Sequence, residues 1–152
     1  MDQCEAGMTA ELDPGTKTVC ICGSFRHFDE MVTFRDALLA SGVSCEWPTS
    51  ELRRDPKTMT DAEGKAAIVA HLERMDRADV ILVFNQDGWV GNSVAMEIGY
   101  AYARRKPLYA LQPIPDQFLM GLLSGVVSSK KFIEITCSAS PGPVDPRRPK
   151  AK

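Results

Sequence analysis

Glu97 is a carboxylate in an apolar stretch that has helical character. Ala95, Met96 and Ile98 are its nearest apolar neighbours. A helix face turned to solvent would carry more polar side chains around such a residue. We therefore interpret Glu97 as a candidate for chemistry on a ligand. The alternative is a structural ion pair with an arginine such as Arg104.

A glycine-rich loop directly precedes this stretch. Gly88 and Gly91 permit unusual backbone angles, and Trp89 offers a flat face for a base or a sugar, or else covers the core. Ser93 is expected to cap the helix that follows. The polar side chains of this loop make it a candidate ligand-binding segment, and they are Asn85, Gln86, Asp87, Asn92 and Ser93.

A second candidate loop, Gly-Ser-Phe-Arg at 23–26, follows the first apolar run. Gly23 allows a ligand to approach the backbone, Ser24 can donate a hydroxyl, and free amides at a helix start favour an anion. Arg26 adds a bidentate donor for phosphate or carboxylate. The alternative is a tight turn with a surface arginine. The loop matches neither the Walker A pattern nor G-x-G-x-x-G, so neither ATP nor NAD is expected.

The elements that position these loops alternate between strands and helices. The apolar runs predict strands at 18–22, 43–47, 79–84, 107–111 and 131–135, and the periodicity predicts helices at 29–41, 61–76, 93–105 and 117–123. In the helix at 61–76 the expected inward side chains are Ala67, Ile68, Leu72 and Met75. This order indicates a doubly wound, flavodoxin-like α/β fold, a five-stranded parallel sheet with helices on both faces. Ligands bind such sheets outside the carboxyl ends of the strands, where both loops lie.

Composition narrows the classes of protein further. The chain has 152 residues, which suits a single domain at 17–137 between disordered tails at 1–16 and 138–152. A net charge of −2 does not favour a nucleic acid polymer as partner. No apolar run is long enough to span a membrane, and the acidic N-terminus does not resemble a signal peptide. We therefore expect a cytoplasmic location. Of the five cysteines, Cys20 and Cys22 would point to the same face of a strand and are interpreted as reduced, buried and apolar in role, with reactive or metal-binding thiols as the minority alternative.

Four segments in one order carry a resemblance to a known family. They are Val-Cys-Ile-Cys-Gly-Ser-Phe-Arg at 19–26, Ala-Asp at 78–79, Met-Glu-Ile-Gly-Tyr-Ala at 96–101 and Lys-Pro at 106–107. Together they resemble the nucleoside 2-deoxyribosyltransferase family, which includes 2'-deoxynucleoside 5'-phosphate N-hydrolases and pyrimidine nucleotide N-glycosidases. The similarity spans roughly residues 17–135. The pairing of Gly-Ser-x-Arg with Glu-Ile-Gly-Tyr-Ala is more specific than either motif alone.

The resemblance implies a mechanism and a set of site residues. Glu97 would attack C1' of a sugar, the base would leave, and water or a second base would resolve the glycosyl-enzyme. Gly23, Ser24 and Arg26 would contact the sugar or a 5'-phosphate, and Phe25 would lie near the base. The resemblance implies a homodimer or higher homo-oligomer, because a neighbouring subunit closes the pocket in that family. No metal is expected, since His27 and His71 are the only histidines and they lack ligand spacing with carboxylates on a common face. No cofactor is expected either.

Two positions depart from the family pattern. His71 stands eight residues before Asp79, where the family carries an aspartate, and Gly91 stands six residues before Glu97, where it carries another acid. Histidine can orient a sugar hydroxyl or act as an acid, and the nearby Asp87 could contact or protonate the base. These departures motivate the alternative hypothesis, a nucleotide-binding module of the same fold with little or no turnover.

Overall fold

The computed structural model describes residues 17–48 and 55–137. The expected tails at 1–16 and 138–152 lie outside these residues, as do residues 49–54. The limits of a single domain at 17–137 stay a prediction. None of the helices in the described ranges combines the length and apolar character that crossing a membrane requires.

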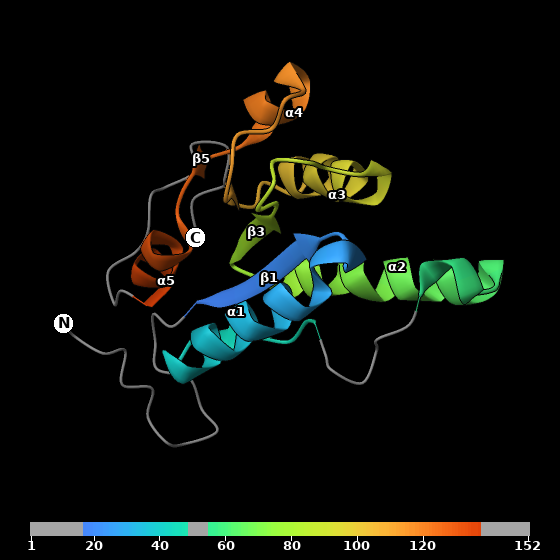
Figure 1. Cartoon of the computed structure of the whole chain (residues 1–152), viewed down its shortest axis with the longest axis horizontal. Coiled ribbons are helices and arrows are strands. Elements are labelled where there is room, and N and C mark those ends of the chain that lie inside the picture. Colours follow the sequence, from blue (N-terminus) through green and yellow to red (C-terminus); the bar gives the residue numbers. More distant parts are fainter. Residues whose placement is uncertain (1–16, 49–54, 138–152) are drawn as a thin grey trace, which may run out of the picture.

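A five-stranded parallel sheet forms the centre of the molecule (Figure 1). Its strands are β1 (Thr18–Gly23), β2 (Ser44–Cys45), β3 (Val80–Phe84), β4 (Leu108–Ala110) and β5 (Gly125–Val126). Their order is β2-β1-β3-β4-β5, and all four pairs are parallel. The doubly wound, flavodoxin-like prediction is therefore confirmed. The strand order changes direction between β1 and β3, which is where such sheets bind ligands.

The helices cover both faces of this sheet. They are α1 (Phe28–Ala40), α2 (Asp61–Arg77), α3 (Asn92–Ala103), α4 (Gln117–Leu122) and α5 (Ser129–Cys137), with the short 3-10 turns η1 (Phe25–His27) and η3 (Pro56–Thr58). A capping box at Thr60 and Glu63 fixes the start of α2. Asp116 caps α4 by accepting hydrogen bonds from two backbone amides.

Alternation along β1 divides the interior into two apolar cores. Val19 and Ile21 face the core formed with α1 and α5, whereas Cys20 and Cys22 face the core formed with α2 and α3. Every residue of β3 is buried, as expected for a central strand covered on both faces. Side chains of β1 that point toward α2 and α3 therefore contact the inward-facing side chains of those two helices.

The prediction of a strand at 131–135 is wrong. These residues belong to α5, and the fifth strand is β5, only two residues long. The β-branched residues at 133 and 135 favour a strand, but Phe132 and Thr136 are four residues apart and are both buried on one helix face. The second strand is also shorter than predicted, because only Ser44 and Cys45 pair with β1.

The inward face of α2 differs from the expected one. His71 and Met75 are its buried residues, Ile68 and Leu72 are half-buried, and Ala67 is exposed. The polar residue at 71 thus lies at the centre of the face that packs against the sheet, where the sequence pattern placed apolar side chains.

Candidate active site beside β1 and β3

Glu97 lies on the face of α3 that packs against the sheet. The buried residues of this helix are Val94, Glu97, Ile98 and Ala101, at the spacing of a single helical stripe. The Glu97 side chain retains 9% of its solvent exposure. The alternative pairing with Arg104 is wrong, because Arg104 Nε lies 2.8 Å from Asp76 Oδ1 instead. Of the apolar neighbours in the sequence, Ile98 is buried with the carboxylate, whereas Met96 is exposed.

Within residues 17–48 and 55–137, only one of the two Glu97 carboxylate oxygens faces a charged or polar partner. Oε1 lies 3.7 Å from His71 Nε2, and Oε2 is buried without a hydrogen-bond partner. Burial raises the pKa of Glu97 above its usual range, although His71 and a hydrogen bond with Cys22 partly oppose this. The structure thus holds a carboxylate whose ionised form is poorly compensated and whose second oxygen is free.

His71 contacts Glu97 directly, at the position where the family resemblance led us to expect an aspartate. Its Nδ1 lies 3.3 Å from Arg74 Nη2. Since a guanidinium can only donate, a neutral His71 accepts at Nδ1 and carries its proton on Nε2, toward Glu97. Burial lowers the pKa of His71, but contact with Cys20 and the charge of Glu97 raise it by more, so it lies above the usual value.

Two thiols of β1 complete the surroundings of His71. Its Nε2 lies 3.5 Å from Cys22 Sγ and 4.0 Å from Cys20 Sγ. A hydrogen bond with Cys22 lowers the pKa of Cys20 to about 5, against the effect of burial, and His71 adds to the decrease. The pKa of Cys22 is raised, first by the same hydrogen bond and then by burial. The sequence analysis placed both thiols on one face of the strand and favoured a role as small apolar residues over reactive or metal-binding thiols.

The expectation of reduced, buried thiols is confirmed for Cys20 and Cys22, which are free and buried. Cys45 is also free and buried, whereas Cys137 is disulfide-bonded.

A chain of aromatic rings connects the loop at 23–26 with His71. Phe25 stacks on Phe28 with ring centroids 5.9 Å apart and meets the edge of Trp47 at 6.2 Å. Trp47 in turn packs against the His71 ring at 5.1 Å. Phe25 is 38% exposed, and its place near a bound base stays a prediction. Trp47 was missed because it follows a strand in the sequence without any motif around it.

A second, exposed group of charged residues lies at the ends of β1 and β3. Asp87 forms an ion pair with Arg26, lies 3.3 Å from His27 Nε2 and accepts a hydrogen bond of 3.1 Å from the Trp89 amide. Partial desolvation raises the pKa of Asp87, but the bonds from Trp89 and His27 and the charge of Arg26 lower it by more. Asp87 is therefore an ionised partner of Arg26 here and not a protonated acid.

Trp89 explains why residue 91 is glycine. The Trp89 side chain is half-exposed and belongs to neither core, so it does not cover the core. The Arg26 guanidinium lies 4.5 Å from its ring centroid. A Cβ at Gly91 would lie 2.7 Å from Trp89 Cη2. An acidic side chain at 91, as in the family, could not coexist with this position of the indole.

The other predicted binding residues have local structural roles. Asn85 is buried, donates a hydrogen bond to the Gln112 carbonyl at 2.9 Å and accepts one from the Leu111 amide at 3.0 Å, which joins the ends of β3 and β4. A Cβ at Gly23 would lie 2.5 Å from Met31 Sδ, so close packing requires this glycine. Ser24 Oγ accepts a hydrogen bond from the Arg26 amide at 3.3 Å.

The start of α3 differs from the prediction. Its N-cap is Gly91, with no side-chain capping bond, so the expectation that Ser93 caps the helix is wrong. Asn92 and Ser93 are the first helical residues and are exposed. Their side chains remain available to a ligand at the helix start.

The structure therefore divides the predicted residues into two groups. Glu97 and His71 form a buried pair, and Arg26, Asp87 and Trp89 form an exposed cluster. Within residues 17–48 and 55–137, no hydrogen bond or ion pair joins the pair to the cluster. A ligand that bridges the two would bring the predicted site together.

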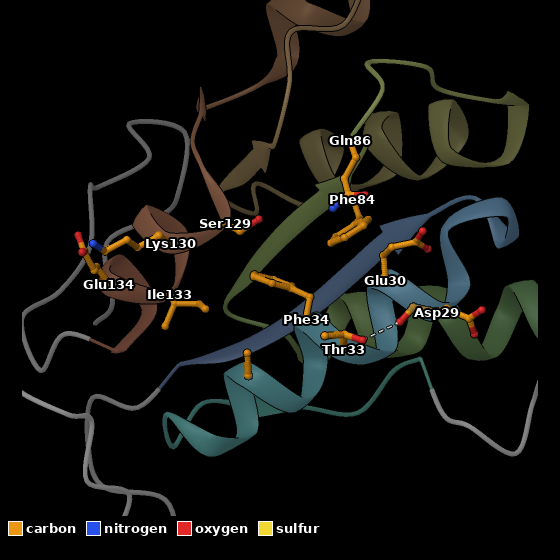
Figure 2. Close-up of a pocket in the computed structure, with 11 residues that line it drawn as sticks. Asp29, Glu30, Thr33, Phe34, Phe84, Gln86, Ser129, Lys130, Ile133 and Glu134 are labelled. Carbon is orange, nitrogen blue, oxygen red and sulfur yellow. Dashed lines mark hydrogen bonds between the residues drawn. The ribbon is translucent and has the colours of Figure 1, made fainter.

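A groove of about 710 Å³ lies on the opposite face of the sheet, between α1 and α5 (Figure 2). Phe34 and Phe84, which line it, belong to the core on the α1 side. Neither Glu97 nor His71 lines this groove. Its other lining residues are Asp29, Glu30, Thr33, Ala37, Gln86, Ser129, Lys130, Ile133 and Glu134.

Comparison with solved structures identifies proteins that share the fold. A 2-deoxyribosyltransferase from the psychrotolerant bacterium Bacillus psychrosaccharolyticus has a TM-score of 0.58 at 14% identity, with 76% of this chain and 90% of that chain covered. A conserved protein from Enterococcus faecalis V583 has a TM-score of 0.54 at 19% identity, covering 78% and 96%. A Clostridium botulinum CMP N-glycosidase has a TM-score of 0.52 at 15% identity, covering 78% and 95%.

These proteins have the fold that the family resemblance implied, and that expectation is confirmed. Two of the three neighbours are enzymes that act on N-glycosidic bonds. No protein-family model and no curated protein matches the chain.

Proposed function

We propose that this protein cleaves or transfers the N-glycosidic bond of a nucleoside or nucleoside 5'-monophosphate, with Glu97 as the nucleophile. The observation that carries the proposal is the free Oε2 of a buried carboxylate beside the carboxyl ends of β1 and β3. The resemblance of the Glu97 motif and the shared fold with a 2-deoxyribosyltransferase and a CMP N-glycosidase support it.

The environment of Glu97 suits attack on an anomeric carbon. Its Oε2 is the attacking oxygen, while the Nε2 proton of His71 faces Oε1 at 3.7 Å and orients the group. Ionised Glu97 is destabilised by burial, and this charge is neutralised as the developing oxocarbenium ion collapses to a glycosyl ester. The role of His71 is therefore to orient the carboxylate of Glu97. It does not supply a second negative charge beside the developing cation.

The exposed cluster is proposed to bind the rest of the substrate. Arg26 supplies a guanidinium for a 5'-phosphate, and the half-exposed Trp89 and Phe25 supply faces for the base. Asp87 is proposed to contact the base as a hydrogen-bond acceptor. It does not act as an acid, because its pKa in the unliganded protein is lowered and keeps it ionised. A homodimer or higher homo-oligomer is part of the same proposal.

A base-release screen tests the proposed function. Nucleosides and 5'-monophosphates, ribo and deoxy, are incubated with the purified protein and free base is measured by chromatography. Glu97→Ala is expected to reduce release at least about 10³-fold, since it removes the nucleophile. Parallel reactions with a second base distinguish transfer from hydrolysis.

Glu30→Ala is the matched control, because Glu30 is an exposed carboxylate on α1 that lines the groove on the opposite face. Its release rate is expected to equal that of the wild type. Equal rates for wild type and Glu97→Ala would refute Glu97 as the nucleophile.

The second candidate function is a nucleotide-binding module without turnover. It is favoured by His71, which replaces a carboxylate that the family places near the developing cation. Saturable binding of a monophosphate by calorimetry, with no base released from any member of the panel, would establish it. Detection of free base would exclude it.

Replacing Asp87 by asparagine is expected to strengthen binding of 5'-monophosphates. Arg26 is engaged by Asp87 in the unliganded protein, so the substitution releases its guanidinium for phosphate. An exposed ion pair contributes at most about 1 kcal/mol, which limits the gain to roughly fivefold. Calorimetry with a monophosphate and its parent nucleoside measures the effect, and the nucleoside should show no gain. Weaker monophosphate binding would mean that the contact of Asp87 with the base contributes more to affinity than the release of Arg26.

A further inference from the structure

Three side chains beside Glu97 offer metal-binding atoms that lie close together. The thiols of Cys20 and Cys22 and one ring nitrogen of His71 all lie within 4.8 Å of one another, and all three residues are buried. The two sulfur–Nε2 distances are 3.5 Å and 4.0 Å. Sulfur and nitrogen ligands of one tetrahedral zinc ion lie about 3.5 Å apart, given bonds of about 2.3 Å and 2.0 Å. The side chains therefore already have nearly the spacing that a shared ion requires.

Glu97 is the candidate for a fourth ligand, because it lies beside His71, although it is not among the three residues whose ligand atoms all lie within 4.8 Å of one another. Its Oε1 lies 3.7 Å from His71 Nε2. Its Oε2 is buried without a hydrogen-bond partner, although the side chain retains only 9% of its exposure. A buried carboxylate oxygen without a partner is costly, and a cation bound beside it would remove that cost.

We infer that Cys20, Cys22, His71 and Glu97 form a binding site for Zn²⁺. Two thiolates, an imidazole and a carboxylate favour zinc over the hard cations Mg²⁺ and Ca²⁺, which take oxygen ligands. Cys20 and Cys22 come from β1, His71 from α2 and Glu97 from α3, so the ion would connect the sheet to both helices on this face.

Arg74 balances the charge of this site. Two thiolates and one carboxylate around a divalent ion leave one net negative charge, and the Arg74 guanidinium lies 3.3 Å from the His71 ring. Zinc at Nε2 moves the ring proton to Nδ1, so Arg74 must leave its contact with Nδ1. Its Nε is buried without a partner, and this donor is available for the thiolates.

Occupation by zinc has a consequence for the reaction, which rests on the proposed function. Glu97 cannot coordinate zinc and attack a sugar at the same time. The zinc-bound protein is then an inactive form, and release of zinc exposes the nucleophile.

Metal titration of the full chain tests the site without measuring activity. Metal-free protein is titrated with Co²⁺, whose tetrahedral complexes absorb strongly in the visible range and show a thiolate charge-transfer band. Zn²⁺ is then added as competitor. The wild type is expected to bind one equivalent of Co²⁺ with a tetrahedral, thiolate-ligated spectrum and to exchange it for Zn²⁺. The double variant C20S/C22S is expected to lose the spectrum, and Glu97→Gln to bind at least tenfold more weakly.

Cys45→Ser is the matched control, because Cys45 is a buried free thiol of β2 outside the cluster. It should bind one equivalent like the wild type. Circular dichroism checks the fold of each variant, and Glu97→Gln tests the site should the double variant fail to fold. Absence of stoichiometric binding by the wild type, or equal binding by Glu97→Gln, would overturn the inference. Failure to find base release would leave the zinc result unchanged. The proposed function and the zinc site can therefore be refuted independently of each other.

Discussion

Glu97→Gln is expected to make the protein more stable at pH 7 while removing base release. The carboxylate is buried on the face of α3 that packs against the sheet, and its Oε2 has no partner. Burial is the largest cause of its raised pKa, and contacts with His71 and Cys22 do not compensate fully. A neutral carboxamide of nearly the same shape avoids the cost of the buried charge. The buried carboxylate of Glu97 therefore lowers the free energy of unfolding while it provides the proposed nucleophile.

The sign of the pH dependence follows from the raised pKa. A group whose pKa is higher in the folded state contributes stability below its unfolded pKa of 4.5 and loses it as pH rises through the folded pKa. Ionisation of Glu97 therefore weakens the wild type at pH 7 and does not affect it near pH 4. We expect a gain for Glu97→Gln on the order of 1 kcal/mol at pH 7, which is a rise in Tm of about 2–4 °C, and little gain at pH 4.

Thermal unfolding of the metal-free proteins in the presence of a chelator measures this difference. Glu30→Gln is the control, because Glu30 is an exposed carboxylate on α1. A loss of stability for Glu97→Gln at pH 7, or an equal gain at both pH values, would show that the buried charge is not what limits stability.

Much of the fold and the central residue of the site could be predicted from the sequence. The continuous apolar run at 80–84 identifies a buried parallel strand, and alternation of strands with helices determines the sheet order. Val94, Ile98 and Ala101 define a helical stripe, and Glu97 falls on it. A carboxylate within an apolar stripe is detectable because helical periodicity is local in the sequence.

The partners of Glu97 could not be predicted in the same way. Cys20 and His71 are 51 residues apart, and their contact depends on how α2 packs against β1. Periodicity placed Ala67 and Ile68 inward and did not identify the face that turns His71 toward the sheet. The ion pair of Arg26 with Asp87 also depends on β1 and β3 being neighbours. The sequence therefore identified two candidate ligand-binding loops but did not show that they contact each other.

The mistaken fifth strand has a different cause. Two residues, Gly125 and Val126, are too few to show strand periodicity, and the following segment contains isoleucines at 133 and 135 that favour a strand. Helical packing of Phe132 and Thr136 against the core determines the outcome. Intrinsic preference is outweighed here by the burial of one large aromatic side chain.

Phe132→Ala is therefore expected to be among the most destabilising single substitutions in the chain. Phe132 is 0% exposed, and its ring centroid lies 6.1 Å from that of Phe34 and 6.2 Å from that of Tyr109. Through this side chain, α5 packs into the core formed with α1. Truncation leaves a cavity there and costs roughly 3–5 kcal/mol of unfolding free energy.

Urea unfolding followed by circular dichroism measures that cost. Phe118→Ala in α4 is the matched control, because the Phe118 side chain is 77% exposed and its truncation should change stability by no more than about 0.5 kcal/mol. The same substitution at 132 also tests the assignment of α5. If Phe132→Ala costs no more than Phe118→Ala, the segment 129–137 does not pack on the sheet through this residue, and the groove between α1 and α5 loses one of its walls.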